Sequence, residues 1–392
     1  MKRRSIWRNY NKPYVANHSI EWIQSGEKYY DRLVEIIASA NTEIQLQTYI
    51  FKADRTGRKI ANALIDAAKR GVNIYILIDA YGSQDMSLEL QQTMEAAGIQ
   101  LRRYGVLFSK GRFHIARRLH RKVMVIDGQT AVVGGINIAD QYAGTSKMPA
   151  WLDFAAIVTG STAGRLELIC RSRWKLIKFP KKPKTDKKQA SHPSIMIRVR
   201  RNDFVRNQNE IAISYRQAFR QAEKTLVIVG GYFLPGGRTR RLIKNAVNRG
   251  VDVSVLVAEK SDVGIMVSAR RYLYGWLTKN GIRVFEYRPS NVHGKVIIRD
   301  DKWCSIGSYD LNNLSTFSNI ELNLDVNNVE FSKSISDHIQ HIMKGESTEI
   351  TLRSMLMNRN ILTRLKCWLA YRFVKILFVL SVVLAGKKDE KQ

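Results

Sequence analysis

One pattern occurs twice in the chain, and it constrains the fold more than any other feature. The first copy occupies residues 120–135 and the second occupies residues 293–308. Both copies read H-x-K-x4-D-x6-G-[GS], where x is any residue. A histidine and a lysine two residues apart mean little alone, but the whole pattern at matched places indicates an internal repeat. We therefore expect the chain to fold as two similar halves.

The segments around the two copies repeat as well. Apolar runs and helical periodicity predict strands and helices that alternate in the same order in each half. Arg70-Gly71-Val72 corresponds to Arg249-Gly250-Val251, an offset of 249 − 70 = 179 residues. Nearly continuous apolar strands between helices are typical of an α/β sheet covered on both faces. The strands are expected at 43–51, 72–79, 99–104, 225–229, 251–257 and 282–287, and the helices at 57–70, 88–97, 238–249 and 263–280.

The length of 392 residues suits two domains or one pseudo-symmetric unit. We expect a first half at 1–177, a linker at 178–194, a second half at 195–345 and a C-terminal segment at 346–392. Two-fold related halves place equivalent elements face to face. The linker is rich in Pro and Lys and lacks a hydrophobic period, which predicts an exposed tether. Contact of this linker with anionic lipid headgroups is the alternative.

The charge of the chain predicts an anionic partner. Its 64 Lys and Arg residues exceed its 34 Asp and Glu residues, a net charge of +30. Nucleic acid and an acidic lipid surface both fit this charge, and the net charge alone does not distinguish these two partners. The content of 45% apolar and 25% charged residues excludes a chain that is disordered throughout. Three widely spaced cysteines cannot form a disulfide framework, which favours reduced thiols in a cytoplasmic compartment.

The C-terminal segment contains the most apolar stretch of the sequence. Residues 376–385 are uncharged, but ten residues are too few for a helix to cross about 30 Å of hydrocarbon. A longer span would include Arg372 and Lys375, each of which costs about 2.5–3.5 kcal/mol at the centre of a membrane helix. We expect an interfacial or re-entrant helix with its cations at the lipid headgroups. The alternative is a helix that packs on the core of the protein. We expect no secretory signal and no membrane span in the interior of the chain.

The spacing inside the repeated motif has a chemical consequence. A His and a Lys two residues apart on a strand point to the same face of the sheet, so they can contact one ligand together. The glycine after the second predicted strand of each motif allows the backbone to approach an anion closely. A neutral imidazole can attack a phosphodiester, a protonated one can donate to the leaving alkoxide, and ammonium groups stabilise the charged oxygens.

The paired motif resembles the signature of the phospholipase D superfamily. Over roughly residues 24–342, including the stretches 79–83 and 281–287, the chain resembles bacterial cardiolipin synthases, most closely the short form without two N-terminal membrane spans. The resemblance implies two pseudo-symmetric α/β/α sandwich halves packed around one shared active site. It also implies a two-step transfer through a phosphohistidine that needs no metal and no other cofactor.

The resemblance also implies roles for individual residues. His120 is expected to be the nucleophile, and His293 the general acid and then the general base. Lys122 and Lys295 would hold the phosphate together with Asn137. Each histidine needs a carboxylate that orients its other nitrogen. Asp153 lies 33 residues after His120 and Glu321 lies 28 residues after His293, and both fit the downstream acids of the family.

Three further acidic positions belong to the motifs. The repeated pattern places Asp127 and Asp300 in the catalytic set. Within it, we expect them to brace the strand and the turn of their motif. The second half departs from the family, because Asp310-Leu311-Asn312 stands where relatives carry Asn and then Asp two residues later. An acidic Asp310 would repel a phosphate. Either Asn312 binds the phosphate in its place, or Asp310 faces away.

These features predict a membrane-associated phosphatidyltransferase. Phosphatidylglycerol would donate its phosphatidyl group, release glycerol, and yield cardiolipin with a second phosphatidylglycerol. The expected partners are anionic phospholipids at the cytoplasmic face of the cell (inner) membrane. We expect no nucleic acid partner, and the sequence leaves the oligomeric state open. A phospholipase D-type hydrolase or a transferase with another acceptor is the alternative. A nuclease or a non-enzymatic basic binding protein is less favoured.

Overall fold

The two halves of the chain build the same series of elements, as the repeat predicts. The computed structural model describes residues 13–105, 108–109, 112–113, 117–174, 195–353 and 361–386, so the expected linker at 178–194 lies outside the described residues. The first half consists of β1 (Val15–Gln24), α2 (Glu27–Ala38), β2 (Glu43–Thr48), α3 (Arg55–Lys69), β3 (Asn73–Asp79), α4 (Leu88–Ala96), β4 (Gln100–Tyr104), β5 (Phe108–Ser109), β6 (Arg112–Phe113), β7 (Arg118–Leu119), β8 (Lys122–Ile126), β9 (Thr130–Gly134), α5 (Asp140–Ala143), β10 (Phe154–Gly160) and α6 (Ser161–Trp174).

The second half follows the same order and ends in an additional long helix. It consists of β11 (Ile195–Asp203), the short helix η1 (Phe204–Arg206), β12 (Gln208–Asn209), α7 (Glu210–Gln221), β13 (Thr225–Gly230), α8 (Gly237–Asn248), β14 (Asp252–Ala258), α9 (Gly264–Lys279), β15 (Arg283–Tyr287), β16 (Lys295–Arg299), β17 (Trp303–Gly307), α10 (Asn313–Phe317), β18 (Asn319–Asn327), α11 (Val329–Gly345), β19 (Ser347–Glu349) and α13 (Ile361–Gly386). The strands and helices expected from periodicity are all present, with ends that differ by no more than three residues.

All the described strands except the pair β5 and β6 form one continuous sheet with an approximate two-fold centre. In the first half the order is β4–β3–β2–β8–β9–β10–β1, and in the second it is β15–β14–β13–β16–β17–β18–β11. An antiparallel pair between β1 and β11 joins the two halves. Strands β2, β3 and β4 of the first half and β13, β14 and β15 of the second are parallel. The motif strands are antiparallel, because short turns connect them.

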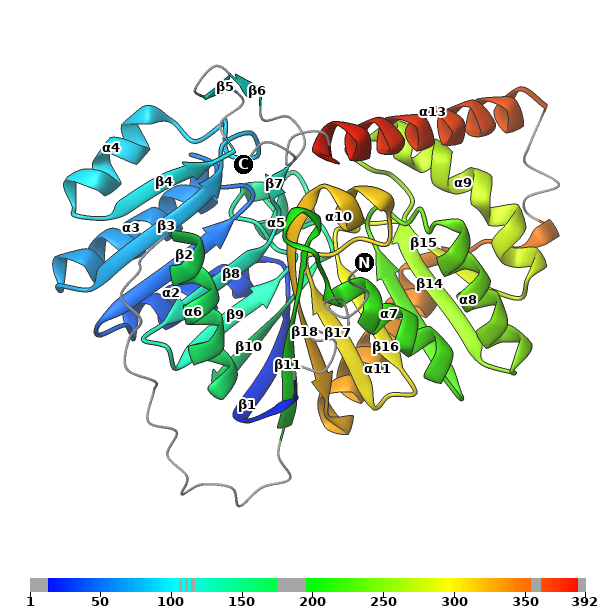
Figure 1. Ribbon diagram of the computed structural model, residues 1–392, viewed down its shortest axis with the longest axis horizontal. Coiled ribbons are helices and arrows are strands. Elements are labelled where there is room, and N and C mark those ends of the chain that lie inside the picture. Colours follow the sequence, from blue (N-terminus) through cyan, green and yellow to red (C-terminus); the bar gives the residue numbers. More distant parts are fainter. Residues whose placement is uncertain are drawn as a thin grey trace, which may run out of the picture.

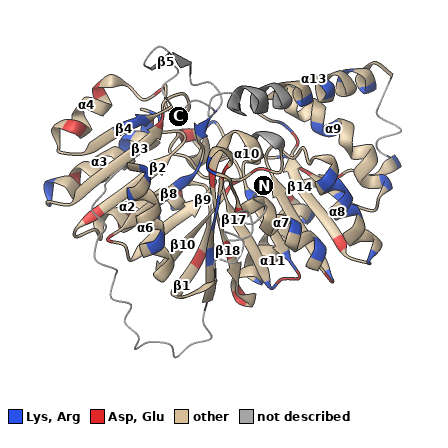
Figure 2. Ribbon diagram, viewed as in Figure 1, with Lys and Arg blue, Asp and Glu red and all other residues tan. Residues whose placement is uncertain are grey.

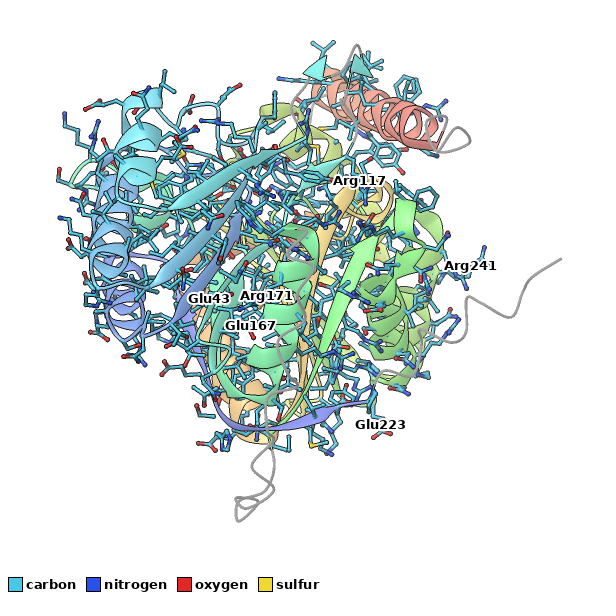
Figure 3. All side chains as sticks on the ribbon, turned by 60° about the vertical axis from the view of Figure 1, so that its left-hand side comes forward. Glu43, Arg117, Glu167, Arg171, Glu223 and Arg241 are labelled. Carbon is cyan, nitrogen blue, oxygen red and sulfur yellow. The ribbon has the colours of Figure 1, made fainter. Side chains whose placement is uncertain are left out.

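Helices cover the sheet in layers, which confirms the predicted pair of α/β/α halves (Figure 1). Helices α2, α3 and α4 pack on the outer face of the first half, and α7, α8 and α9 pack on the second. A third core lies between the halves, where inner-face residues of both sheets meet α6 and α11. Arg171 of α6 forms ion pairs with Glu43 of β2 and Glu167 of its own helix, and these residues are labelled in Figure 3. The shared core therefore holds the two halves in one fixed relation.

Helix ends follow the sequence signals. Asp54 caps the first turn of α3 by accepting a hydrogen bond from the backbone N–H of Gly57. Gly71 and Gly250, directly after the C-caps of α3 and α8, have φ angles of +89° and +90°, which side chains with a Cβ rarely adopt. These matched glycines stop equivalent helices and direct the chain into equivalent strands, β3 and β14.

The long C-terminal helix α13 lies along α9, at the top of Figure 1. Ala370 and Val374 are buried in the core of the second half, and the rings of Tyr371 and Tyr272 stack at 4.7 Å. In the part of the chain that the structure describes, we find no helix with the length and apolar character needed for a membrane span. The structure thus shows a helix docked by one face on the protein.

The shared core makes a direct prediction about stability. Leu324 of β18 is fully buried between the halves. Replacing it with alanine leaves a cavity, so we expect Leu324→Ala to lower the free energy of unfolding by about 2–5 kcal/mol. Urea denaturation followed by circular dichroism measures this change. The exposed Val329→Ala serves as the control and should change stability by no more than about 0.5 kcal/mol. A loss below about 1 kcal/mol for Leu324→Ala would show that the core does not join the halves.

Candidate active site

The segment that carries the first histidine is attached to the second half of the chain. Strand β7, just before His120, pairs in parallel with the beginning of β18, where Leu119 lies opposite Ile320. The backbone N–H of His120 donates to the carbonyl of Ile320 at 3.0 Å. The residue after Ile320 is Glu321, so this backbone pairing brings a carboxylate of the second half beside the histidine of the first.

The second histidine is attached to the first half in the same way. Leu152 and Val292 form an isolated parallel bridge, and the N–H of Leu152 donates to the carbonyl of Asn291 at 2.8 Å. The N–H of His293 donates to the carbonyl of Leu152 at 2.8 Å. Asp153 follows Leu152 directly. The two histidine segments thus exchange backbone hydrogen bonds with the opposite halves.

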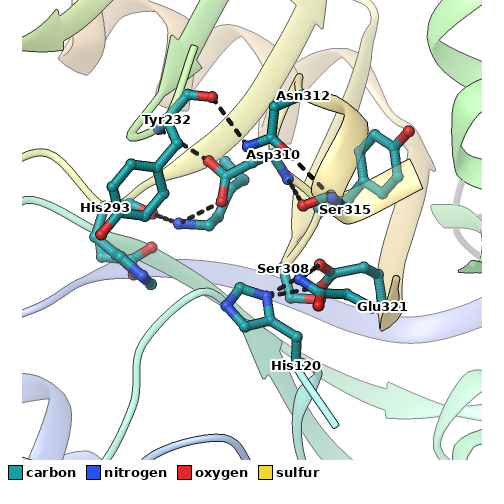
Figure 4. A network of polar contacts seen from close by, with 12 residues as sticks. His120, Tyr232, His293, Ser308, Asp310, Asn312, Ser315 and Glu321 are labelled. Carbon is teal, nitrogen blue, oxygen red and sulfur yellow. Dashed lines mark hydrogen bonds and ion pairs between the residues drawn. The ribbon is translucent and has the colours of Figure 1, made fainter. Parts of the chain in front are cut away.

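Each imidazole is paired with the carboxylate of the other half. Nδ1 of His120 lies 3.0 Å from the Glu321 carboxylate, and Nδ1 of His293 lies 2.7 Å from Oδ2 of Asp153. The expected carboxylates are therefore both present, but the pairing crosses between halves, whereas the sequence spacing had counted each one from the histidine of its own half. With Nδ1 held by a carboxylate, Nε2 of each ring is the nitrogen left for chemistry. Figure 4 shows both histidines in one polar network.

The two carboxylates have different surroundings. Glu321 accepts hydrogen bonds from Ser308 Oγ at 2.5 Å and Asn319 Nδ2 at 3.1 Å. Burial would raise its pKa, but His120, Lys122 and Ser308 outweigh that effect and hold the pKa below its usual value. Gly135 occupies the place of Ser308 in the first motif. A Cβ at Gly135 would lie 2.4 Å from Asp153, so this position leaves no room for a side chain.

Asp153 is consequently the less stabilised carboxylate. It accepts from its neighbour's backbone, Phe154 N–H, at 2.7 Å. Burial raises its pKa to about 6, although Lys295 and Lys122 act in the opposite direction. Burial, Lys295 and Lys122 also lower the pKa of His293 well below its ordinary value. The His293–Asp153 pair therefore binds its additional proton weakly and would bind it more strongly beside an anion.

Each motif lysine contacts the histidine of its own motif. Lys122 Nζ donates to the carbonyl of His120 at 2.6 Å, and Lys295 Nζ donates to the carbonyl of His293. Both side chains are buried. Burial lowers the pKa of Lys122 to about 7, with Lys295 acting in the same direction and Glu321 against it. Mutual influence between the lysines and the opposite carboxylates shows that the four charged groups share one site.

Two tyrosines that flank the lysines form walls of the site. The ring of Tyr49 lies 4.9 Å from that of His120, and Lys122 Nζ is 5.2 Å from its centre. The ring of Tyr232 lies 6.4 Å from that of His293, and Lys295 Nζ is 5.9 Å from its centre. The sequence analysis did not identify Tyr49 as a residue of the site. Both tyrosines follow equivalent strands, β2 and β13, which is the signal that could have found Tyr49.

Asp127 and Asp300 do not belong to the catalytic group. They stand at the far ends of β8 and β16, about 16 Å of strand from the lysines. The Asp127 carboxylate accepts from the N–H groups of residues 41–43, and Asp300 accepts from those of residues 223–225. Both have positive φ angles, 52° and 53°, in the turns after the motif strands. Their placement in the catalytic set is therefore wrong, and both residues brace the strand and the turn of their motif.

The asparagines hold loops. The Asn137 amide accepts from Ile50 N–H at 3.0 Å and donates to Tyr142 OH at 2.7 Å, so its contact with phosphate stays a prediction. Asn312 donates to the carbonyl of Tyr232 and accepts from Ser315 N–H, which occupies both ends of its amide within its own loop.

Asp310, and not Asn312, lies beside the lysine of the second motif, where the sequence analysis expected Asn312 to bind the phosphate. It lies 3.4 Å from Lys295 Nζ and accepts from Tyr232 N–H at 3.1 Å. Asp310 therefore neither faces away nor yields its place to Asn312, and both expectations are corrected. The reason is local: Lys295 is buried and needs a counter-charge, which Asp310 supplies.

The described residues contain no group of three or more His, Cys, Asp and Glu side chains that is suited to a metal ion. The arrangement supplies two imidazoles, each with Nδ1 on a carboxylate, and two lysine side chains beside them. Such a set can transfer a phosphoryl-type group by nucleophilic attack, with charge stabilisation from the lysines.

Comparison with known proteins agrees with this chemistry. The family model described as "Cardiolipin synthase, PLD-like domain" matches residues 33–147 and 215–343. Cardiolipin synthase B of Shigella flexneri is 30% identical over 94% of this chain and 89% of its own length. Cardiolipin synthase B of Salmonella typhimurium is 31% identical over 91% of this chain and 88% of its own length. The crystal structure of phosphatidylserine synthase of Haemophilus influenzae shares the fold, with a TM-score of 0.73 at 14% identity, over 96% of this chain and 98% of that one.

The lowered pKa of Lys122 predicts that anion binding takes up protons. At pH 7.5, part of the Lys122 population is neutral, and a bound oxyanion favours the ammonium form. Sulfate, which does not titrate in this range, should therefore bind more tightly below pH 7 than above it. Calorimetry in two buffers of different ionisation enthalpy should show uptake of a fraction of a proton at pH 7.5. In Lys122→Arg, which stays charged, the uptake should fall by at least half. Equal uptake in both proteins would disprove this assignment.

Proposed function

The chain belongs to the cardiolipin synthase family of phospholipase D-like proteins, and from this premise we propose that it transfers a phosphatidyl group from one phosphatidylglycerol to another. The observation that carries the proposal is the crossed pair of histidines, each with Nδ1 on a carboxylate and Nε2 available, beside two lysines. The reaction is a phosphatidyl transfer that releases glycerol and yields cardiolipin. Oxyanion-stabilising cations and paired imidazoles are what a phosphodiester, itself anionic, requires for attack.

In the first step Nε2 of His120 attacks the phosphorus of phosphatidylglycerol. The bond from phosphorus to the glycerol headgroup breaks, and the leaving alkoxide takes a proton from Nε2 of His293. The products of this step are a phosphatidyl-histidine at His120 and free glycerol. Lys122 and Lys295 stabilise the negative charge on the non-bridging oxygens.

In the second step a second phosphatidylglycerol provides the attacking hydroxyl. His293, now neutral, takes the proton of this hydroxyl, and the oxygen attacks the phosphorus. The bond between phosphorus and Nε2 of His120 breaks, which regenerates the imidazole and releases cardiolipin. Water in place of the lipid hydroxyl would give hydrolysis.

The assignment of the two roles is supported by the carboxylates. Glu321, held ionised by His120, Lys122 and Ser308, keeps the proton of His120 on Nδ1 and leaves Nε2 as a nucleophile. His293 needs an additional proton to act as an acid, and burial and the two lysines oppose this proton. An anionic substrate between the lysines offsets their charge, so substrate binding itself loads His293 with its proton.

We also propose that α13 places the enzyme on an anionic bilayer. One face packs on α9 through Ala370 and Val374, while large apolar side chains on the remaining surface are 42–80% exposed. Residues 361–386 contain four cations and no acidic residue, and Figure 2 shows Lys and Arg along the described part of this helix. Apolar side chains in the acyl layer with cations at the headgroups fit a peripheral helix. The exposed apolar residues are Ile361, Leu362, Leu365, Trp368, Leu369, Phe373, Ile376 and Leu377.

The face of the membrane is inferred from the cysteines. Cys170, Cys304 and Cys367 are buried free thiols. Unpaired cysteines suit a reducing compartment, which supports the cytoplasmic face of the cell membrane.

The role assignment predicts different fates for label in two variants. Purified protein mixed with phosphatidylglycerol labelled in its phosphate should lose at least about 1,000-fold in cardiolipin formation with His120→Ala or His293→Ala. Mass spectrometry of the lipids measures this loss. The acid-labile protein label should be absent from His120→Ala but should accumulate slowly and persist in His293→Ala, where the second step lacks its base. Label at His293 in the His120→Ala protein would reverse the roles, and unchanged cardiolipin formation would refute the proposal.

The membrane proposal predicts a loss of lipid binding. The triple variant Leu365→Ser, Leu369→Ser, Phe373→Ser removes apolar area from the exposed face, and each side chain contributes about 1.5–3 kcal/mol when buried in the acyl layer. Binding to phosphatidylglycerol vesicles in flotation assays should weaken at least about 100-fold. The control is Leu88→Ser, because Leu88 is 67% exposed on α4 in the other half. Equal loss in the control, or no loss in the triple variant, would contradict membrane docking through α13.

A further inference from the structure

A polar cleft lies on the other side of Glu321 from the catalytic pocket. It lies between α6, β11 and the beginning of β18. It is open to solvent beside Arg206, whose side chain is 54% exposed. The side chains that give the cleft its character are Arg121, Arg173, Arg201, Arg206, Asn202 and Glu321.

Arg121 is the middle residue of the first H-x-K motif. Because side chains alternate along an extended segment, it points away from the face that carries His120 and Lys122. It is 3% exposed, and its Nε and one terminal nitrogen both donate to Oε1 of Gln47. Among the described residues, no carboxylate lies within ion-pair distance of Arg121. A buried guanidinium without a counter-ion points to a ligand that supplies one.

Five arginines in or beside the cleft form a cluster whose positive charge is only partly balanced by carboxylates. They are Arg117, Arg121, Arg173, Arg201 and Arg206. Asp203 pairs with Arg117 at 2.6 Å, Arg173 at 2.9 Å and Arg206 at 3.9 Å. Arg201 pairs with Glu210 at 3.5 Å. Counting Arg121 and Glu321, five guanidiniums face three carboxylates, an excess of 5 − 3 = +2. Burial, together with Arg173 and Arg201, lowers the pKa of Arg121 to about 10, as expected for a cation that lacks a partner.

Two buried polar atoms at the cleft also lack hydrogen-bond partners among the described residues. Oδ1 of Asn202, a fully buried residue that lines the cleft, accepts no hydrogen bond from the part of the chain that the structure describes, while its Nδ2 donates to the carbonyls of Ser315 and Thr316. Nε of Arg117 is buried and donates to none of the described residues. Buried polar atoms in folded proteins are nearly always satisfied. A hydroxyl on the bound anion, whether of a protonated phosphate or of a headgroup, would satisfy the Asn202 acceptor.

The second motif has no arginine at the position that matches Arg121. Gly294 stands where the first motif has Arg121, and a Cβ at Gly294 would lie 3.0 Å from the ring of Phe154. The fold of the motif therefore does not require an arginine at this position. Its presence in one half only indicates a use beyond the architecture that the halves share.

We propose that this cleft is a second anion site, which binds a phosphate group, either free or in a lipid headgroup, on Arg121, Arg201 and Arg206. Arginine is suited to this task because its planar fork binds phosphate oxygens in pairs. The site is separate from the catalytic pocket, but Glu321 belongs to both, since it orients His120 on one side and lines the cleft on the other. The proposal concerns binding alone and does not depend on the transfer reaction.

Calorimetric titration of the full chain in detergent micelles tests the site. All proteins carry Lys122→Gln to weaken the catalytic phosphate contacts, and the titrants are inorganic phosphate and the short-chain lipid dihexanoyl phosphatidylglycerol. Adding Arg121→Gln or Arg206→Gln should weaken binding about 10-fold or more. The control is Arg241→Gln, because Arg241 is exposed on α8, away from Arg117 of this cluster (Figure 3), and it should change nothing. Arg206 is largely exposed, so its variant should fold, and thermal unfolding checks this.

The outcomes separate the sources of the ligand. Arginine-dependent binding of phosphate identifies a free-anion site, and arginine-dependent binding of the lipid alone identifies a headgroup site. Dependence of both titrants on the arginines supports the shared phosphate chemistry. No binding in the Lys122→Gln background, or binding that Arg121→Gln and Arg206→Gln leave unchanged, overturns the proposal. Loss of phosphatidyl transfer in the histidine variants is a separate result and leaves this test unaffected.

Discussion

The exchange of histidines between the halves is the constraint on which the rest of the structure depends. Each histidine segment is hydrogen-bonded through its backbone to the opposite half, and each imidazole takes its carboxylate from that half. Neither half alone contains a complete histidine–carboxylate pair. The site therefore exists only when the halves are packed, and the apolar core between them holds the geometry that the chemistry requires. Folding of the shared core and assembly of the site are the same event.

The two halves share one backbone fold but carry different side chains at matched positions of the site. Ser308 donates to Glu321, whereas Gly135 in the matched position only makes room for Asp153. His120, Lys122 and Ser308 together hold Glu321 as an anion, whereas burial raises the pKa of Asp153. A symmetric frame thus produces an asymmetric pair of imidazoles. Such asymmetry is what a reaction with one nucleophile and one proton donor needs.

Much of this architecture could be predicted from the sequence because it depends on local patterns. Periodicity located the strands and helices, and the spacing in H-x-K placed each His and Lys on one face. Counting along the chain could not reveal the crossed carboxylates, because Glu321 reaches His120 through packing across 201 residues. Tyr49 was missed because an aromatic residue at a strand end stands out only when the equivalent strands of the two halves, β2 and β13, are compared. The pairing of Asp310 with Lys295 arises from burial, which the sequence does not display.

The crossed pairing is tested most directly by the Nδ1 protons of the two histidines. In protein labelled with ¹⁵N-histidine, NMR resolves these protons when each is held by a carboxylate. The account predicts that Glu321→Gln shifts the Nδ1 signal of His120 and leaves that of His293 in place, and that Asp153→Asn does the reverse. The opposite pattern, in which each substitution moves the signal of the histidine in its own half, would contradict the shared site.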